Sequence, residues 1–268
     1  ASASTYYFKI QLSKADGTPG DWSGYIPVAA ENEKVVDGNK QYDYPNGLRT
    51  LLNGGKVKDE AGREYELPKT TDNKGDKTQI YGIVFATGKG RNISIGGKQP
   101  EENILEGDEY TAWTEIREHI KYLELREYEL DTYTGSSYFA NMHKVETLEL
   151  PQCGMTVGNG VNWQYFSNAD NLKKITIWNG SRSVDITEYE GPVLQNSVGE
   201  YMFSNCFSLS TKYINRLIRD VSEIKGNAFY ADEGNRGKFS NDADHNMAIE
   251  IPSSVTKIGS QAFYNRLK

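Results

Sequence analysis

The sequence predicts a β-rich α/β protein with two parts, a β-rich N-terminal domain over residues 1–108 and a solenoid of stacked repeats over residues 109–268. Two observations predict this organisation. Short stretches in which apolar and polar residues alternate are typical of strands with one buried face. A phenylalanine-centred pattern also returns several times, but only in the second half, and such self-similarity is typical of a repeat array.

Four segments of the N-terminal part have the pattern of strands, and residues 46–52 that of a short helical turn. Clusters of Gly, Asn, Asp and Pro, such as those at 16–20 and 37–39, separate these elements. An antiparallel sandwich or a small α+β sheet fits them best, and this part resembles no known family. The predicted strands are residues 6–12, 24–29, 79–86 and 92–95.

Residues 96–108 have the composition of a linker, and the segment after them is predicted to be a helix. Apolar residues stand at Tyr110, Trp113, Ile116 and Ile120, and this spacing places them on one face of an amphipathic helix. Terminal units of a solenoid must cover its open end. We therefore expect this helix to cap the repeat core at its N-terminal side.

The repeats share the pattern Phe-x-Asn, followed by a small or soft residue and then an aliphatic one. The marker phenylalanines are spaced 27, 37, 26 and 34 residues apart. The shorter steps fall within the roughly 20–29 residues of a leucine-rich repeat, and the longer ones imply insertions at 180–195 and 231–246. The marker residues are Phe139, Phe166, Phe203, Phe229 and Phe263.

Each unit is expected to supply one short strand and one Phe-bearing turn, and stacked units form a parallel ladder around a phenylalanine column. Met142, Ala169 and Cys206 occupy one equivalent position, which indicates a small buried site. The recurring Asn is expected to satisfy turn backbone and to adopt a left-handed conformation. Besides the phenylalanines, the predicted repeat core consists of Leu148, Leu150, Ile175, Ile177, Ile249 and Ile251.

The segments 203–209 and 251–263 carry the most specific motifs, including Ile258-Gly259 and Ala262-Phe263. With them, about residues 120–268 resemble the BspA-type leucine-rich repeat, a bacterial class abundant on the surfaces of Bacteroides-like bacteria. The resemblance implies a secreted or surface-displayed protein that acts in adhesion or protein recognition. A lipid anchor on a removed N-terminal signal is one route to such a location.

Composition excludes several classes of function. The chain has 30 Lys and Arg against 37 Asp and Glu, a net charge of −7, whereas nucleic-acid binders usually carry a basic excess. Its longest apolar runs, such as residues 80–86, are far shorter than the roughly 18 residues of a membrane span. Cys153 and Cys206 are too few for a disulfide scaffold.

No catalytic, metal or cofactor site is predicted. A phosphate-binding loop fails because Gln99 follows Gly97-Lys98 where Ser or Thr is required. The three histidines, His119, His143 and His245, lie in three different predicted elements, so a His-based site is not expected. The acidic residues of the second insertion lack the ordered spacing of a calcium loop.

Aromatic residues at predicted loops and strand ends are the remaining functional signal, because Tyr and Trp anchor protein contacts and stack on sugars. The candidate binding residues are Trp163, Tyr165, Trp178 and Tyr189. The sequence thus predicts a non-enzymatic protein whose partners are host or bacterial surface proteins. The alternative is a glycan-binding accessory protein that uses Trp or Tyr of the N-terminal domain.

Overall fold

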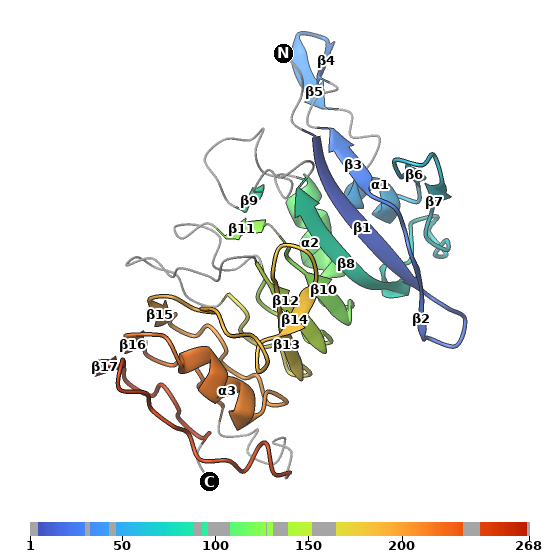
Figure 1. Cartoon of the computed structure of the whole chain (residues 1–268). Helices are drawn as coiled ribbons and strands as arrows, with labels where there is room; N and C mark the ends of the chain where they lie inside the picture. Colours follow the sequence, from blue (N-terminus) through green and yellow to red (C-terminus); the bar gives the residue numbers. More distant parts are fainter. Residues whose placement is uncertain are drawn as a thin grey trace.

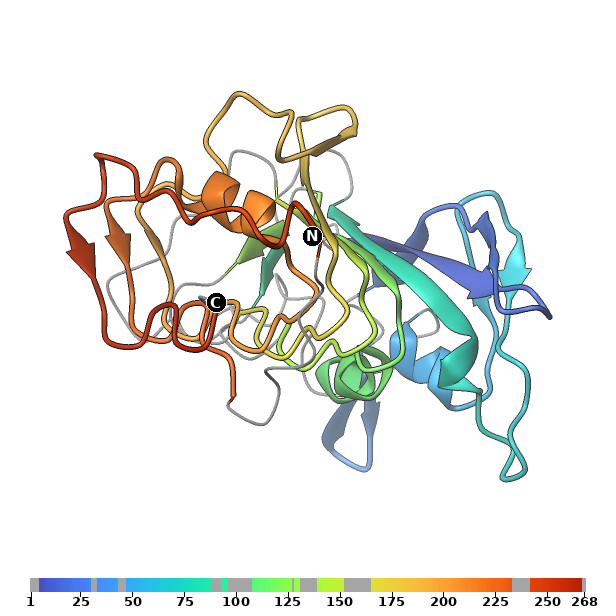
Figure 2. The same ribbon diagram turned by 90° about the horizontal axis from the view of Figure 1, so that it is seen from below.

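The central feature of the computed structural model is an eight-stranded sheet that runs without interruption from the N-terminal strands into the repeats (Figures 1 and 2). The order is β14-β13-β12-β10-β8-β1-β2, and β3 also pairs with β1. The structure describes residues 5–29, 33–42, 47–87, 93–95, 108–126, 128–130, 139–151, 165–232 and 242–266. The strands of this sheet are β1 (Thr5–Ser13), β2 (Pro19–Trp22), β3 (Ile26–Ala29), β8 (Ile80–Thr87), β10 (Tyr122–Glu124), β12 (Thr147–Leu150), β13 (Lys174–Trp178) and β14 (Ser183–Asp185).

The separate N-terminal domain expected from the sequence is not confirmed, because β8 pairs in parallel with the first repeat strand, β10. The register places Ile83 opposite Leu123, and both side chains are fully buried. One hydrophobic cluster contains residues of both halves. The β8 strand thus acts as the first rung of the ladder, and a boundary at residue 108 separates no independent core.

The smaller elements of the N-terminal half surround this sheet. The four predicted strands correspond to β1, β3, β8 and β9, and the predicted helical turn corresponds to α1 (Leu48–Leu52). A contact between α1 and α2 includes an ion pair of 3.1 Å between Arg49 and Glu115. The remaining elements are β4 (Glu33–Val36), β5 (Asn39–Tyr42), β6 (Val57–Lys58), β7 (Glu64–Tyr65), η1 (Lys77–Gln79), β9 (Ile93–Ile95), α2 (Asp108–Ile116) and β11 (Tyr128–Leu130).

Helix α2 packs where the two halves meet. Its Trp113 is fully buried between Phe85 of β8 and the first marker, Phe139, with ring centroids 5.2 and 5.7 Å apart. The sequence located this helix, but the pairing of β8 with β10 places further strands on its N-terminal side.

A column of aromatic rings forms the axis of the repeats. Successive marker phenylalanines lie 6.3, 5.6, 5.8 and 5.5 Å apart between ring centroids. Four of them are fully buried, and Phe263 at the last unit is half-buried. Such columns bury large apolar area at each step, and that burial holds consecutive units together.

The turns beside the column need left-handed backbone, and Asn supplies it. Asn141, Asn168, Asn205 and Asn265 all have φ between 57° and 61°. Asn tolerates this region better than other residues with a Cβ atom. The side chains also form a ladder, since the Asn168 amide donates to Asn141 Oδ1 at 2.8 Å and the Asn205 amide to Asn168 Oδ1 at 3.0 Å. The recurring Asn therefore stabilises the turns.

The repeat half also contains a second, short parallel sheet. Its parallel strands are β15 (Ser197–Val198), β16 (Glu223–Ile224) and β17 (Lys257–Ile258). A separate parallel pair is formed by β9 and β11. No helix in the described part of the chain is long and apolar enough to cross a membrane.

The prediction that Ile249 and Ile251 lie in a buried ladder strand is wrong. They form no strand. Ile251 is 45% exposed, whereas Ile249 is partly buried and packs against the hydrophobic core. The preceding unit supplies helix α3 (Thr211–Ile218) where the ladder would need a strand, and a helix offers no free row of backbone groups for pairing. Asn215 of α3 bonds this segment instead, donating to Ala248 O at 3.0 Å and accepting from Glu250 N at 2.9 Å.

Candidate functional site

The large sheet has one face toward the hydrophobic core and one face away from it. Alternation along each strand sends Leu123, Leu148 and Ile175 into the core, so their neighbours point to the opposite side. We call this opposite side the outer face. Its side chains include Lys9, Gln11, Trp22, Tyr25, Tyr122, Glu124, Arg126, Glu149, Thr176 and Trp178.

Arg126 and Trp178 form the centre of this face. The Arg126 guanidinium carbon lies 4.6 Å from the centroid of the Trp178 ring. The same guanidinium donates to Glu124 Oε2 at 3.1 Å and to the Tyr25 hydroxyl at 2.6 Å. Lys9 lies 4.4 Å above the Tyr25 ring. These groups come from four different segments, and their mutual contacts hold a half-buried Trp in a fixed orientation.

A second aromatic pair lies on the outer face nearer the N-terminus. The rings of Trp22 and Tyr122 meet edge to face with centroids 5.7 Å apart. Gly82 of β8 provides the space for them, because a Cβ atom there would lie 3.1 Å from both Trp22 Cη2 and Tyr122 Cβ. Both rings are half-buried, so part of each remains accessible.

Two carboxylates occupy adjacent strands beneath the hairpin of β13 and β14. Glu124 and Glu149 stand opposite each other in the parallel register, and Glu149 is fully buried. Burial, with a further contribution from Glu124, raises the pKa of Glu149 to about 8. The Ser183 hydroxyl hydrogen-bonds Glu149 Oε1, while Oε2 has no partner among the described residues. A carboxyl that stays neutral at pH 7 is the expected state of this group.

The first insertion, 180–195, is held in place from below by α3. Arg216, whose side chain is largely buried, donates to the carbonyl oxygens of Ile186, Tyr189 and Gly191 at 2.7, 2.8 and 2.6 Å. Tyr213 of α3 donates to Asp185 Oδ2 at 2.6 Å. The insertion is therefore an ordered loop.

The structure describes three of the four candidate binding residues, and their surroundings differ. Trp178 lies on the outer face, and Tyr189 is half-buried against the core. Tyr165 is only 1% exposed, so its predicted role at a binding surface is wrong; it packs beside Phe166 with centroids 6.1 Å apart. Trp163 lies outside the described residues, as does Cys153.

Sequence reasoning missed Trp22, Tyr25, Tyr122 and Arg126. The sequence predicts no strand over residues 19–22, whereas Trp22 ends strand β2. The signal that was present is the alternation itself, since Tyr122 and Glu124 flank the core residue Leu123. Their meeting with Trp22 and Tyr25 depends on strand pairings between distant segments, which alternation does not reveal.

The groups considered for chemistry have structural partners. His143 lies 3.1 Å from Asp170, and His245 lies 2.9 Å from Asp242. Cys206 is buried, and burial raises the pKa of its thiol to about 12, which disfavours the reactive thiolate. Within the described residues, no three His, Cys, Asp or Glu side chains are grouped as metal ligands.

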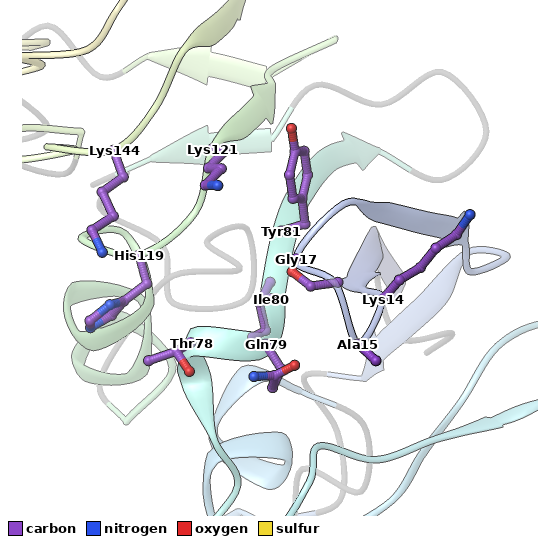
Figure 3. A pocket seen from close by; sticks show the side chains of 11 residues that line it. Lys14, Ala15, Gly17, Thr78, Gln79, Ile80, Tyr81, His119, Lys121 and Lys144 are labelled. Carbon is purple, nitrogen blue, oxygen red and sulfur yellow. The ribbon is translucent and has the colours of Figure 1, made fainter.

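A pocket of about 260 Å³ lies where strands β8 and β10 begin (Figure 3). It is bounded by the turn after β1, by η1 with the start of β8, by the turn after α2, and by the first repeat turn. Figure 3 shows Lys144 extending toward His119 with Lys121 beside it, while Lys14 on the opposite rim points away. The lining residues are Ser13, Lys14, Ala15, Gly17, Thr78, Gln79, Ile80, Tyr81, His119, Lys121 and Lys144.

Comparison with known protein families finds one match, which covers part of the chain. The model of the BspA type leucine rich repeat region (6 copies) matches residues 118–190 and 235–268. No curated protein matches the chain. No solved structure matches it either. The match covers the ladder strands β10, β12 and β13 and the last unit, in agreement with the resemblance identified from the sequence.

Proposed function

We propose that this chain, which carries BspA-type leucine-rich repeats, is a surface-displayed or secreted module that recognises other proteins and catalyses no reaction. The repeats support this proposal, because proteins with this repeat are typically found at the surface or outside the cell. Solenoids of stacked repeats present extended surfaces that suit large partners. The partners we expect are host or bacterial surface proteins.

The observation that carries the proposal is the group of aromatic and arginine side chains on the outer face. Trp, Tyr and Arg dominate the energetics of protein interfaces. Here Trp178 and Arg126 are held against each other at 4.6 Å and tied to Tyr25. Because these side chains are already held in place, less conformational entropy is lost when a partner binds.

The ordered insertion extends this surface. It begins at the hairpin that follows Trp178, and α3 fixes its far end through Arg216. Because the outer face and the insertion share strand β13, a partner that contacts Trp178 also reaches residues 180–185. We therefore expect the binding surface to combine both.

The test is an array of extracellular-matrix proteins, bacterial surface proteins and glycans, probed with the chain and two variants. Trp178→Ala should weaken binding to any protein hit by roughly 30-fold or more, as expected for an interface anchor. Tyr264→Ala is the matched control, because Tyr264 is a half-buried aromatic that stacks on Tyr230 near the last unit. Equal binding by both variants, each folded by circular dichroism, would contradict the outer face as the interface.

A second candidate function, glycan binding, is supported by the Trp22–Tyr122 pair. Partly accessible aromatic rings are the usual platforms for sugars. Trp22→Ala should then abolish glycan hits on the same array, and free sugar should compete for them. Protein hits that survive Trp22→Ala would favour the first proposal over this one.

A further inference from the structure

The pocket of Figure 3 gathers positive charge in an acidic protein. Lys144 extends toward His119, Lys121 lies beside them, and no carboxylate side chain is among the described residues that line the pocket. The whole chain has a net charge of −7. A local excess of cations in such a chain attracts anions against the field of the remaining surface.

No carboxylate of the described residues forms an ion pair with either lysine. Within the described part of the chain, neither Lys121 nor Lys144 has an Asp or Glu oxygen within 4.0 Å. Lys121 instead lies 5.7 Å from the centroid of the Tyr81 ring. Both side chains are exposed, so an anion could reach their ammonium groups without any rearrangement of the fold.

The pKa of His119 is lowered, and neighbouring lysines contribute to the shift. Desolvation is the largest cause of its lowered pKa, and Lys77 and Lys144 lower the pKa further. The carboxylates of Glu118 and Asp76 oppose them with smaller effects. The imidazole is therefore neutral at pH 7 and retains one N–H that is able to donate to an anion.

The surroundings of the pocket indicate which anion fits. Phosphate sites are commonly built from free backbone N–H groups, but three of those here are already bonded: Lys121 N to Tyr81 O, Gly17 N to Lys14 O and Thr78 N to Asp76 Oδ1. A sugar needs an open aromatic face, and the Tyr81 face has Lys121 above it. What remains is a small opening with side-chain cations, which suits a single carboxylate on a flexible chain.

We propose that Lys121, Lys144 and His119 form a seat for the carboxylate of an acidic side chain, Asp or Glu, in a peptide segment of the partner protein. This rests on the proposed function, since it specifies part of the partner that the scaffold recognises. The seat lies at the junction of the two halves, so it also gives residues 13–17 and 78–81 a role in recognition.

The experiment titrates the whole chain with a twelve-residue peptide of alternating Glu and Gly, and with its Gln counterpart. The three histidines, His119, His143 and His245, are followed by nuclear magnetic resonance as pH is varied. The Glu peptide should raise the pKa of His119 by about 1 unit, because a nearby anion favours imidazolium. His143 and His245 should not respond, and the Gln peptide should leave all three unchanged.

Variants test the seat itself. Lys121→Gln with Lys144→Gln should weaken the Glu peptide by about tenfold, since two exposed charge pairs are lost. Lys74→Gln with Lys212→Gln removes the same charge at exposed lysines outside the pocket, and Lys14→Gln removes the lysine that points away. Both controls should retain affinity within about twofold.

Other outcomes would overturn the proposal. These are an unresponsive His119, equal loss of affinity in the pocket and control variants, or a His119 response to inorganic phosphate or heparin but not to the Glu peptide. If protein hits on the array survive in the Lys121/Lys144 variant and His119 ignores the peptide, the seat is refuted while the proposed function stands. If the array is silent but His119 responds, the seat stands and the proposed function fails.

Discussion

At the scale of single residues, each side chain has a role set by its depth in the stack. The marker phenylalanines are equivalent in sequence, yet Phe203 has a ring on each side whereas Phe263 has one only on the side of Phe229 among the described residues. Equal residues in a repeat are therefore unequal in energy, because burial depends on neighbours in the next unit.

This difference gives a stability prediction. Phe203→Ala should lower the free energy of unfolding by about 3–5 kcal/mol, since a fully buried ring leaves a cavity that the column cannot fill. Phe263→Ala should cost clearly less, because that ring is half-buried. Urea unfolding followed by tryptophan fluorescence measures both, and equal losses would contradict the column as described.

Glu149 gives a prediction for pH dependence. Its pKa is raised to about 8 in the folded chain and is near its ordinary value of 4.5 in the unfolded chain. Between these values the unfolded state releases a proton that the folded state keeps. Stability is therefore fully present below pH 4.5 and is lost as pH rises through 8, with a limiting slope of about 1.4 kcal/mol per pH unit.

Glu149→Gln tests this directly, because Gln keeps the shape without the charge. The variant should show a flatter stability profile from pH 5 to 8 than the parent chain, as measured by urea unfolding at each pH. Ser183→Ala, which removes the neighbouring hydroxyl but no ionisable group, should keep the parent's slope. Parallel profiles for Glu149→Gln and the parent chain would mean that Glu149 is ionised when folded.

At the scale of elements, α3 replaces a ladder strand in its repeat unit. Ser210 caps its N-terminus, because its hydroxyl accepts a hydrogen bond from Tyr213 N at 3.4 Å. The helix buries Ile214, Leu217 and Ile218. On its other side Arg216 holds the insertion by three carbonyl bonds. One helix thus both replaces a strand in its repeat unit and binds the loop beside it.

Removal of Arg216 should release that loop. Arg216→Ala leaves Ile186 O and Tyr189 O without their arginine donor and leaves Gly191 O with only Arg219. We expect a loss of about 2–5 kcal/mol in stability and fast amide hydrogen exchange in residues 186–191. Arg219→Ala is the control, because Arg219 is more exposed and bonds Glu190 O and Gly191 O from the surface. Equal exchange in both variants would show that Arg216 does not fix the insertion.

At the scale of the whole molecule, the N-terminal half and the repeats share one sheet and one hydrophobic cluster. Strand β8 is shared in effect by both, since it pairs with β1 on one side and with β10 on the other. Trp113 continues the aromatic column across the same junction. A break between the halves would expose Ile83, Phe85 and Leu123 together.

The chain should therefore unfold in one cooperative transition. Calorimetry is expected to give one peak with equal calorimetric and van't Hoff enthalpies. The isolated segment 109–268 should lack a cooperative transition, because it loses the strand that covers β10. Two resolved peaks for the intact chain would restore the division into separate domains at residue 108.

Much of this molecule is determined by the sequence alone, because its repeats are local. The left-handed Asn turns and the alternating strands depend on residues a few positions apart, and the recurrence of the phenylalanines is visible along the chain. The structure contains all three. The tertiary structure decided what depends on distant partners. The pairing of β8 with β10 joins the two halves, α3 leaves Ile249 and Ile251 without a strand neighbour, and Tyr165 packs into the column.

The candidate sites follow the same division. Trp178 was identified from its position at the end of a strand, but Arg126, Tyr25 and Trp22 reach it or its sheet only through pairings between segments far apart. The cations of the pocket likewise come from three separate segments, the turn after β1, the turn after α2 and the first repeat turn. Local periodicity determines which face a side chain occupies, whereas register between distant strands determines its neighbours, and binding depends on the neighbours.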